Sequence, residues 1–266
     1  MVSRERTLRT DALVLRHMEI GEADRLLTLF TEKQGKVRAI AKGVRKLHSR
    51  KAGHLEPFTH VHIQLARGRN LLILTQAETI EAFPELRENL ESLGQASYVI
   101  ELVDRFTFEG EENLPIFRLV IHTFHRLQAA PDPALVLRYF EMRLLDQLGF
   151  RPELQHCVNC ERPIAAEDQY FSADHGGVLC PRCGANLPGA RPISMHALRY
   201  LRHFQRSSFE QARIAEPSAA IHTELEILMH HYLTFLLERS LNTPAFMRKM
   251  RRELNQDPAS SGSGSL

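Results

Sequence analysis

Apolar and polar residues alternate along several short stretches within residues 1–80. The clearest is HVHIQLA, in which Val61, Ile63 and Leu65 alternate with His62 and Gln64, the two-residue period of a half-buried strand. Stretches of this character cover residues 8–17, 25–31, 36–41, 59–66 and 71–80. Glycine-containing turns, EKQGK and ARGRN, separate two pairs of them. Five short strands in so few residues predict a small β-barrel of the OB or SH3-like type.

After Pro84 the apolar residues recur every three or four positions, which is the spacing of amphipathic helices. The expected helices begin at Ser92, Pro115, Asp132, Ser194 and Pro244. The third should end at Gly149, and the longest helix of the chain should form in AAIHTELEILMHHYLTFLLERSL. The tail DPASSGSGSL has nothing to bury, so we expect disorder at the C-terminus.

Four cysteines form two CxxC pairs, at Cys157, Cys160, Cys180 and Cys183. The 19 residues between the pairs are within the spacing of a four-cysteine zinc ribbon. Two residues between thiolates allow one tight turn to present both sulfurs to the same tetrahedral ion, and a second turn completes the coordination shell. The sequence therefore predicts one structural Zn²⁺, which stabilises a segment of about 30 residues that is too short to form its own core.

Two details of the cysteine motifs leave alternatives open. His156 and His175 are close enough along the chain to replace a ligand. The turn after each pair favours glycine, which the second pair has in Gly184, whereas the first pair has Glu161. Four unrelated or redox-active cysteines are the alternative to a metal site.

Composition narrows the class of protein and its expected location. The chain is 43% hydrophobic and 25% charged, which suits a globular protein with more than one domain. No apolar run approaches the roughly 20 residues of a membrane helix, and MVSRERTLRTD lacks the apolar segment of a secretory signal. We therefore expect a cytoplasmic protein with no membrane partner, in which cysteines bind metal rather than form disulfides.

The formal net charge is only +2, but the charges are unevenly distributed. Residues 1–80 hold 15 Lys and Arg against 8 Asp and Glu, a balance of +7, whereas residues 81–150 have a balance of −6 and residues 151–266 one of +1. The segment 35–51 contains seven cations and no acid: Lys36, Arg38, Lys42, Arg45, Lys46, Arg50 and Lys51. Further cations on neighbouring strands are Arg16, Arg25, Arg67 and Arg69. Such crowding on a small barrel favours nucleic acid as the partner over an idle surface.

The aromatic residues suggest how nucleic acid would be bound. Residues 1–80 contain no Trp or Tyr, and Phe30 and Phe58 are in strand-like contexts where we expect core packing. Base stacking should therefore be weak, and phosphate contacts should dominate with little sequence preference. If about four to seven cations each neutralise one phosphate, the logarithm of affinity should fall with the logarithm of salt concentration at a slope of roughly −3 to −6.

Motifs for catalysis are absent or incomplete. No GxxxxGK[ST] is present, so a P-loop ATPase is excluded. His122 and His125 lie on one helical turn, but neither HExxH nor a carboxylate-rich motif accompanies them, so we expect surface or partly buried histidines. Several helical carboxylates are expected on the wet side of their helices: Glu101, Asp104, Glu141 and Asp146. Two alternatives stay open, a metal-dependent nuclease that uses these histidines and an RNA-binding zinc-ribbon protein.

Longer motifs extend from about residue 8 to residue 250. They are GEADRLLTLFTEKQGKVRAIAKGVRK, LLILTQAETIE, RYFEMRLLDQLGFRPELQHCVNC, HGGVLCPRC and FLLERSLNTPAFMRK. In these motifs the chain resembles the RecO family of bacterial DNA repair and recombination-mediator proteins. The run MRLLDQLGFRPELQHC, which leads into the first CxxC pair, is the most specific of them.

The resemblance implies an α+β multidomain fold with an N-terminal five-stranded OB-fold barrel and an α-helical C-terminal domain that contains an inserted four-cysteine zinc ribbon. The expected bounds are 1–82 for the barrel, 83–152 and 186–254 for the helical domain, 153–185 for the ribbon and 255–266 for a disordered tail. It also implies binding to single- and double-stranded DNA, annealing of complementary strands, and no nucleotide hydrolysis.

The implied partners are RecR, sometimes RecF, and single-strand-binding protein, with the RecA recombinase loaded on the DNA at the nucleoid. We assign phosphate contacts first to the seven cations of residues 35–51 and then to the four on neighbouring strands. A C-terminal cluster is a candidate second contact: Arg248, Lys249, Arg251 and Arg252. The helical domain is expected to hold the acidic, hydrophobic-ended tail of single-strand-binding protein.

Overall fold

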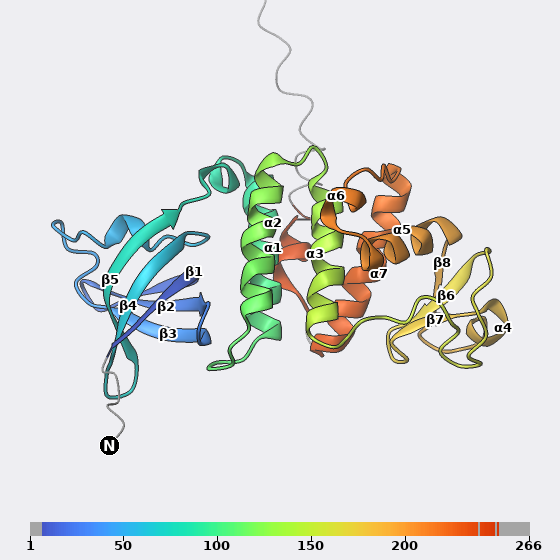
Figure 1. Cartoon of the computed structure of the whole chain (residues 1–266), viewed down its shortest axis with the longest axis horizontal. Helices are drawn as coiled ribbons and strands as arrows, with labels where there is room; N and C mark the ends of the chain where they lie inside the picture. The colour runs from blue at the N-terminus through green and yellow to red at the C-terminus, as the bar shows by residue number, and fades with distance from the viewer. Residues whose placement is uncertain (1–6, 239, 248, 250–266) are drawn as a thin grey trace, which may run out of the picture.

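The computed structural model describes residues 7–238, 240–247 and 249. A β-barrel lies at one end of an elongated molecule, helices occupy the middle, and a small second sheet lies at the other end (Figure 1). No helix within the described ranges is long and apolar enough to cross a membrane. Most of the C-terminal basic cluster, Arg248, Arg251 and Arg252, and the whole predicted tail 255–266 lie outside the described residues.

The N-terminal part is a closed five-stranded barrel. Its strands are β1 (Thr7–Ile20), β2 (Asp24–Thr31), β3 (Gly35–Ala41), β4 (His60–Arg67) and β5 (Leu72–Glu81). The strand order is β1-β2-β3-β5-β4, with β4 pairing back to β1 and only β3 and β5 parallel. The predicted OB-fold is confirmed, and every strand begins and ends within three residues of its predicted bounds.

The alternating pattern fills the barrel interior as predicted. Val61, Ile63 and Leu65 are buried in a core that all five strands supply, while His62 points into solvent. The β2–β3 turn depends on Gly35, which has a φ of 58°. A Cβ at Gly35 would lie 1.7 Å from the carbonyl oxygen of Glu111, so the turn and the loop packed against it require glycine.

Helices form the middle of the molecule. They are η2 (Pro84–Arg87), α1 (Leu90–Phe106), α2 (Leu114–Ala129), α3 (Pro133–Gln147), α5 (Met195–Arg206), α6 (Phe209–Ala212) and α7 (Ala219–Leu237), and residues 242–247 are also helical. The predicted starts at Pro115, Asp132 and Ser194 are confirmed to within one residue. The predicted cap Ser92 is wrong, because its N–H donates to the side chain of Asn89, which caps α1 instead.

Phenylalanines join the barrel to the helices. The ring of Phe30 lies 6.2 Å from that of Phe117 on α2, and the ring of Phe58 lies 6.0 Å from that of Phe124. Both barrel rings are buried, so the predicted packing role is confirmed, although the core they enter is shared with the helices. Neither ring is available for stacking with a base.

The second sheet belongs to the cysteine-bearing segment, which we call the ribbon (residues 153–193). It contains β6 (Gln169–Ser172), β7 (Gly177–Leu179), the short helix α4 (Pro181–Gly184) and β8 (Arg191–Ile193), in the sheet order β7-β6-β8. Phe171 packs edge-on against Tyr232 of α7 at 5.2 Å between ring centroids, and Val178 enters the same core. The ribbon is therefore anchored on the helical part.

Candidate nucleic-acid surface and metal centre

The basic segment continues from β3 into a loop that folds back over the barrel. In this loop Lys51 Nζ donates to the carbonyl oxygen of Leu74 at 3.4 Å, and His54 Nδ1 lies 2.7 Å from Thr79 Oγ1. Leu74 and Thr79 belong to β5, the parallel neighbour of β3. These contacts hold the loop, including the 3₁₀ turn η1 (Ala52–His54), against β5, and Val44 and Leu55 of the loop are buried in the barrel core.

A groove of about 1060 Å³ lies between this loop and the outer faces of β1, β4 and β5. Arg50 and Lys51, two of the predicted phosphate contacts, line it. The groove also contains side chains that were not predicted as contacts: Arg9, Gln64, Thr75, Gln76 and Glu78. All five lie on the predicted strands, but the sequence pattern does not say which strands border one groove.

Six of the eleven predicted cations are exposed and form no ion pair within the part of the chain that the structure describes. They are Arg38, Lys42, Lys46, Arg50, Arg67 and Arg69, which we call the open cations. Ala39 pairs with Leu72, so Arg38 lies near the β4–β5 turn, which contains Arg69 and follows Arg67 at the end of β4. Because no protein anion pairs with these six charges, an anionic ligand would relieve their mutual repulsion.

Three other predicted cations are engaged with nearby protein groups. Arg25 pairs with Glu56 at 2.9 Å, and its side chain is 16% exposed. Arg45 pairs with Glu19 at 3.2 Å on the surface. Lys51 donates to backbone carbonyl oxygens while it borders the groove.

The last two predicted cations face the helices. Lys36 Nζ is 3.1 Å from Asp104 Oδ1, and Arg16 Nε is 3.4 Å from Asp104 Oδ2. Asp104 lies on α1, so both cations connect the barrel to the helical part. The Lys36 side chain is only 13% exposed, whereas that of Arg16 is 64% exposed. The structure thus places Lys36 where it contributes to packing more than to the open surface.

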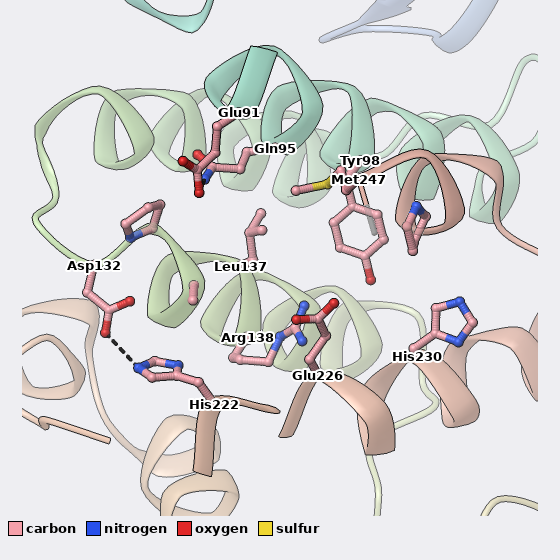
Figure 2. Close-up of a pocket in the computed structure, with 13 residues that line it drawn as sticks. Glu91, Gln95, Tyr98, Asp132, Leu137, Arg138, His222, Glu226, His230 and Met247 are labelled. Atoms are coloured by element: carbon pink, nitrogen blue, oxygen red, sulfur yellow. Dashed lines mark hydrogen bonds and ion pairs between the residues drawn. The ribbon is translucent and has the colours of Figure 1, made fainter. Parts of the chain in front are cut away.

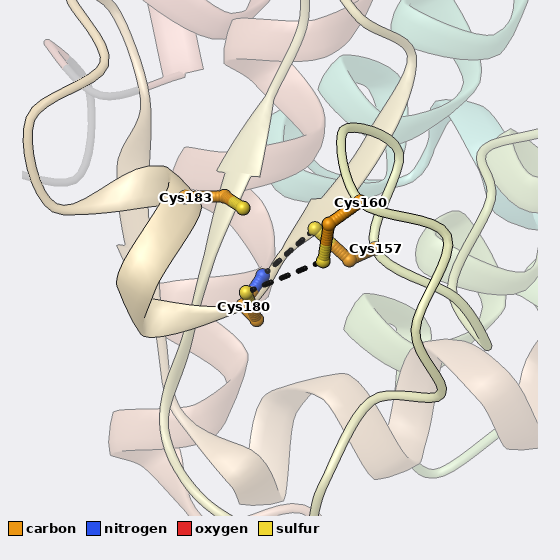
Figure 3. Close-up of side chains that lie close together, drawn as sticks. All are labelled: Cys157, Cys160, Cys180 and Cys183. Carbon is orange, nitrogen blue, oxygen red and sulfur yellow. Dashed lines mark hydrogen bonds between the residues drawn. The ribbon is translucent and has the colours of Figure 1, made fainter.

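The four cysteines converge at one end of the ribbon (Figure 3). Their Sγ atoms all lie within 4.8 Å of one another, and Cys160 Sγ is 3.9 Å from Cys180 Sγ. Four sulfurs bound at about 2.3 Å around a tetrahedral ion are about 3.8 Å apart, so the cluster has the dimensions of a metal site. Within the described ranges, no other group of three or more His, Cys, Asp or Glu ligand atoms gathers in this way.

The two candidate substitute ligands are engaged elsewhere. His156 Nδ1 lies 3.8 Å from Glu153 Oε1, and His175 Nδ1 lies 2.9 Å from Ser172 Oγ. Neither histidine belongs to the cluster of sulfurs. The four thiols alone can therefore hold a metal ion.

Hydrogen bonds within the cluster favour ionisation of one thiol. Burial opposes ionisation of Cys157, but N–H groups of Cys160, Cys180 and Asn159 outweigh burial and lower the pKa of Cys157 to about 6. At Cys183 the Asn159 side chain favours the thiolate, but hydrogen bonds with Cys180 and the other cysteines outweigh it and raise the pKa to about 11. A divalent cation that binds four thiolates would displace the remaining protons.

The turns after the two CxxC pairs differ. Glu161 has a φ of 60°, and its N–H donates to the carbonyl oxygen of Cys157 at 2.8 Å. This non-glycine residue thus adopts the left-handed conformation that the sequence made doubtful. Gly184 does not adopt that conformation, so the turn preference predicted for it is wrong. A Cβ at Gly184 would lie 2.4 Å from Tyr170 Cβ, and this close contact is the reason for glycine.

A cavity of about 210 Å³ lies in the helical part among α1, α3 and α7 (Figure 2). Two of its lining residues contact Glu141, which is fully buried: Tyr98 Oη donates to Glu141 Oε1 at 2.7 Å, and Arg138 Nη2 donates to the same oxygen at 2.5 Å. Burial outweighs these two partners and raises the pKa of Glu141 to about 7. The prediction that Glu141 lies on the wet side of its helix is therefore wrong.

The other candidates for catalysis have structural partners. His125 Nε2 is 3.2 Å from Glu81 Oε2, and its ring packs on Phe83. Glu101 accepts backbone N–H groups of Asn242 and Thr243, so it caps the helical turn that begins there. The histidine pair contributes to no cluster of metal ligands within the described residues.

The fold and the site define a class of protein: an OB-fold barrel joined to a helical part that carries a four-cysteine cluster. Comparisons with known proteins cover both parts. The family models "Recombination protein O N terminal" and "Recombination protein O C terminal" match residues 5–83 and 87–245. The chain therefore belongs to the RecO family.

Individual relatives support the assignment. A protein named DNA repair protein RecO from Roseiflexus sp. (strain RS-1) is 42% identical over 261 residues, which cover 98% of this chain and 92% of that protein. Proteins of the same name from Pelotomaculum thermopropionicum and Dehalococcoides mccartyi (strain CBDB1) are 35% and 34% identical, over 97% and 91% of this chain and 98% and 96% of their own lengths. Each relative is named a DNA repair protein.

Proposed function

We propose that this chain is a non-enzymatic mediator of recombinational repair. It binds single- and double-stranded DNA through the phosphate backbone, anneals complementary strands, and helps RecA assemble on DNA that single-strand-binding protein has coated. RecR, and RecF in some settings, act with it. The observation that carries the proposal is the set of six open cations, three of which, Lys42, Lys46 and Arg50, lie on the loop that borders the barrel groove.

The barrel surface suits a ligand with repeated negative charges. The open cations take the phosphate contacts, with Arg9, Arg45 and Lys51 beside them. Arg16, Arg25 and Lys36 act mainly through their carboxylate partners. Annealing requires two polyanions to approach, and a surface that neutralises both reduces their repulsion without any covalent step. With both phenylalanines buried, the barrel has little means of reading bases.

Charge reversal in the loop tests the proposal. A K46E/R50E variant should anneal complementary oligonucleotides at least about tenfold more slowly than the wild type, because two phosphate contacts become repulsive. A matched control, R118E/R162E, reverses two exposed arginines on α2 and the ribbon that form no ion pair within the described residues. The control should anneal at the wild-type rate. Equal rates for wild type and K46E/R50E would overturn the assignment to the barrel.

The same assay separates the alternative functions. Labelled DNA incubated with the protein and Mg²⁺ or Mn²⁺ should form duplex and stay intact, whereas cleavage would support a nuclease. Competition between RNA and DNA of one sequence should leave DNA bound at least equally well. A strong preference for RNA would point instead to readout of the 2′-hydroxyl.

We propose Zn²⁺ as the ion of the cysteine cluster, with a structural role. Four thiolates at these separations leave no position open for water or substrate. The ion would connect the turn at Cys157 and Cys160 to the start of α4. Metal analysis of the purified protein should return one zinc per chain, and a stoichiometry near zero in protein prepared without chelators would contradict this.

We place the acidic tail of single-strand-binding protein in a cleft of about 320 Å³ between α2, α3 and α6. Its apolar walls include Ala129, Leu135 and Val136, and Arg126 stacks on the ring of Phe209 at 4.1 Å. Two carboxylates also line the cleft, but Asp132 pairs with His222 and Glu210 with Arg213. The apolar walls and Arg126 then complement an acidic peptide that ends in a hydrophobic residue. R126E should weaken binding of such a peptide, while R118E on the same helix should not.

A further inference from the structure

Helix α5 presents a second basic surface that the net charge of the C-terminal half conceals. Its sequence, MHALRYLRHFQR, contains no acid. The basic side chains recur every three or four residues and therefore share one face: His196, Arg199, Arg202, His203 and Arg206. The opposite face is buried and consists of Ala197, Leu198, Leu201 and Phe204. We call the face with these five basic residues the α5 basic face.

The α5 basic face borders a groove of about 480 Å³ whose lining also includes Tyr200 and Ala215. None of its five basic residues pairs with a carboxylate within the described part of the chain. Backbone carbonyls fix two of the guanidinium groups, since Arg202 Nε donates to Leu154 O at 2.7 Å and Arg206 Nε to Arg202 O at 3.2 Å. Burial and the nearby charge of Arg206 lower the pKa of Arg202 and outweigh the opposing effect of the Glu153 carboxylate.

The composition of the groove favours a polynucleotide over an acidic peptide or a lipid surface. Tyr200 and two imidazoles lie among the arginines, and the Tyr200 hydroxyl is held by the carbonyl oxygen of Glu216 at 3.1 Å. Flat rings beside guanidinium groups suit unpaired bases together with their phosphates. Ala215 is the one aliphatic residue among the groove-lining residues of the described chain, so an apolar peptide end has little to contact.

The position of α5 separates this surface from the barrel. Figure 1 shows α5 beyond α3, with α1, α2 and α3 between it and the barrel strands β1 to β5. Arg199 and Arg206 are seven residues apart, or about 10 Å along the helix. An extended single strand spaces its phosphates more widely than the roughly 3.4 Å rise of one strand in a duplex, so this length fits about two of them.

We propose that the α5 basic face binds a second segment of single-stranded DNA while the barrel holds the first. The inference rests on the proposed function, because it assigns the second strand of the annealing reaction to a place on the same chain. Two strands held on one molecule meet at a higher effective concentration than two free strands. The rings on α5 give this surface the stacking contacts that the barrel lacks.

Native mass spectrometry with an oligothymidine of about 10 nucleotides tests the proposal, since that length is within the roughly 4–16 nucleotides that small single-strand sites occupy. At low salt the wild type should bind two oligonucleotides per chain and R199E/R206E one. R199K/R206K should restore the second, which a purely structural role of the arginines would not predict. The control R118E/R162E should also bind two. A wild type that saturates at one, or an R199E/R206E variant that still binds two, overturns the proposal.

Photocrosslinking locates the second oligonucleotide. Oligonucleotides that carry iodouracil should crosslink to Tyr200 in the wild type and in K46E/R50E, because the α5 basic face does not depend on the barrel. Absence of crosslinks on α5, combined with tighter binding of polyglutamate than of DNA by that face, would assign it to an acidic protein and overturn the proposal. If R199E/R206E matches the wild type while K46E/R50E loses annealing, the barrel function stands and only this inference fails.

Discussion

At the residue scale, a turn can require glycine for two reasons, a positive φ or a lack of space for a Cβ, and both apply at Gly35. It has a φ of 58°, and a Cβ there would meet the carbonyl oxygen of Glu111 at 1.7 Å. Gly21, in the neighbouring β1–β2 turn, has nearly the same φ of 56°, but a Cβ there would have no neighbouring atom within 4 Å. Gly21→Ala should therefore cost about 1 kcal/mol of unfolding free energy, and Gly35→Ala roughly 2–4 kcal/mol. Equal losses in denaturant titrations would mean that the contact with the Glu111 loop contributes nothing.

Glu141 gives the helical part a pH-dependent stability. Because burial raises its pKa to about 7, the folded chain keeps a proton that the unfolded chain releases between about pH 4.5 and pH 7. This contribution to the unfolding free energy is complete below that window and is lost as the pH rises through it. Glu141→Gln removes the titration and keeps an oxygen that accepts from Tyr98. The variant should gain stability relative to the wild type from pH 4.5 to 7, and parallel stability curves would contradict the argument.

At the scale of elements, loss of metal should unfold the ribbon first. The segment has three short strands, and its cysteines hold together turns that are far apart in sequence. Cys183→Ser or a strong chelator should abolish metal binding and increase hydrogen exchange in residues 153–193. The ribbon should lose several kcal/mol of stability, because its metal is lost and because Phe171 and Val178 then leave the shared core. The barrel amides should keep their protection. Global unfolding at the same chelator concentration would show that the ribbon is not a separate unit.

The predicted and missed elements differ in the range of the interactions that determine them. Strand alternation and the two CxxC spacings are local signals, so the barrel strands and the cysteine cluster could be predicted from the sequence. The start of α1 depends on whether the side chain of Asn89 or that of Ser92 accepts a backbone N–H of the first turn. The groove depends on the packing of a loop against β5. The basic side of α5 has the helical period, but acids elsewhere in residues 151–266 conceal it in the net charge.

The sequence also does not show which cations form ion pairs within the protein. Lys36 and Arg38 are two residues apart on β3 and equally basic in sequence. Only the position of α1 shows that Lys36 has a carboxylate partner in Asp104, whereas Arg38 is open. A count of cations therefore predicts the basic surface but not which of its members are available to DNA.

At the scale of the whole molecule, this difference predicts that substitution of Lys36 changes folding stability, whereas substitution of Arg38 changes DNA binding. Lys36→Gln removes the ion pair that connects β3 to α1, so it should lower the unfolding free energy while the salt dependence of DNA affinity stays that of the wild type. Arg38→Gln should leave stability unchanged and make the slope of log affinity against log salt shallower by about 0.7 for single strands and about 0.9 for duplex, since one phosphate contact is lost.

Measuring both slopes by fluorescence anisotropy from low to moderate salt, with denaturant titrations of the same preparations, separates the two roles. A shallower slope for Lys36→Gln, with unchanged stability, would place DNA at the junction of barrel and helices. Because the barrel and helices share one core through Phe30 and Phe117, such a strand would have to run along the seam between them, and the open loop would then be peripheral. The structure favours the opposite arrangement, in which the seam holds the molecule together and leaves the outer barrel surface for the polynucleotide.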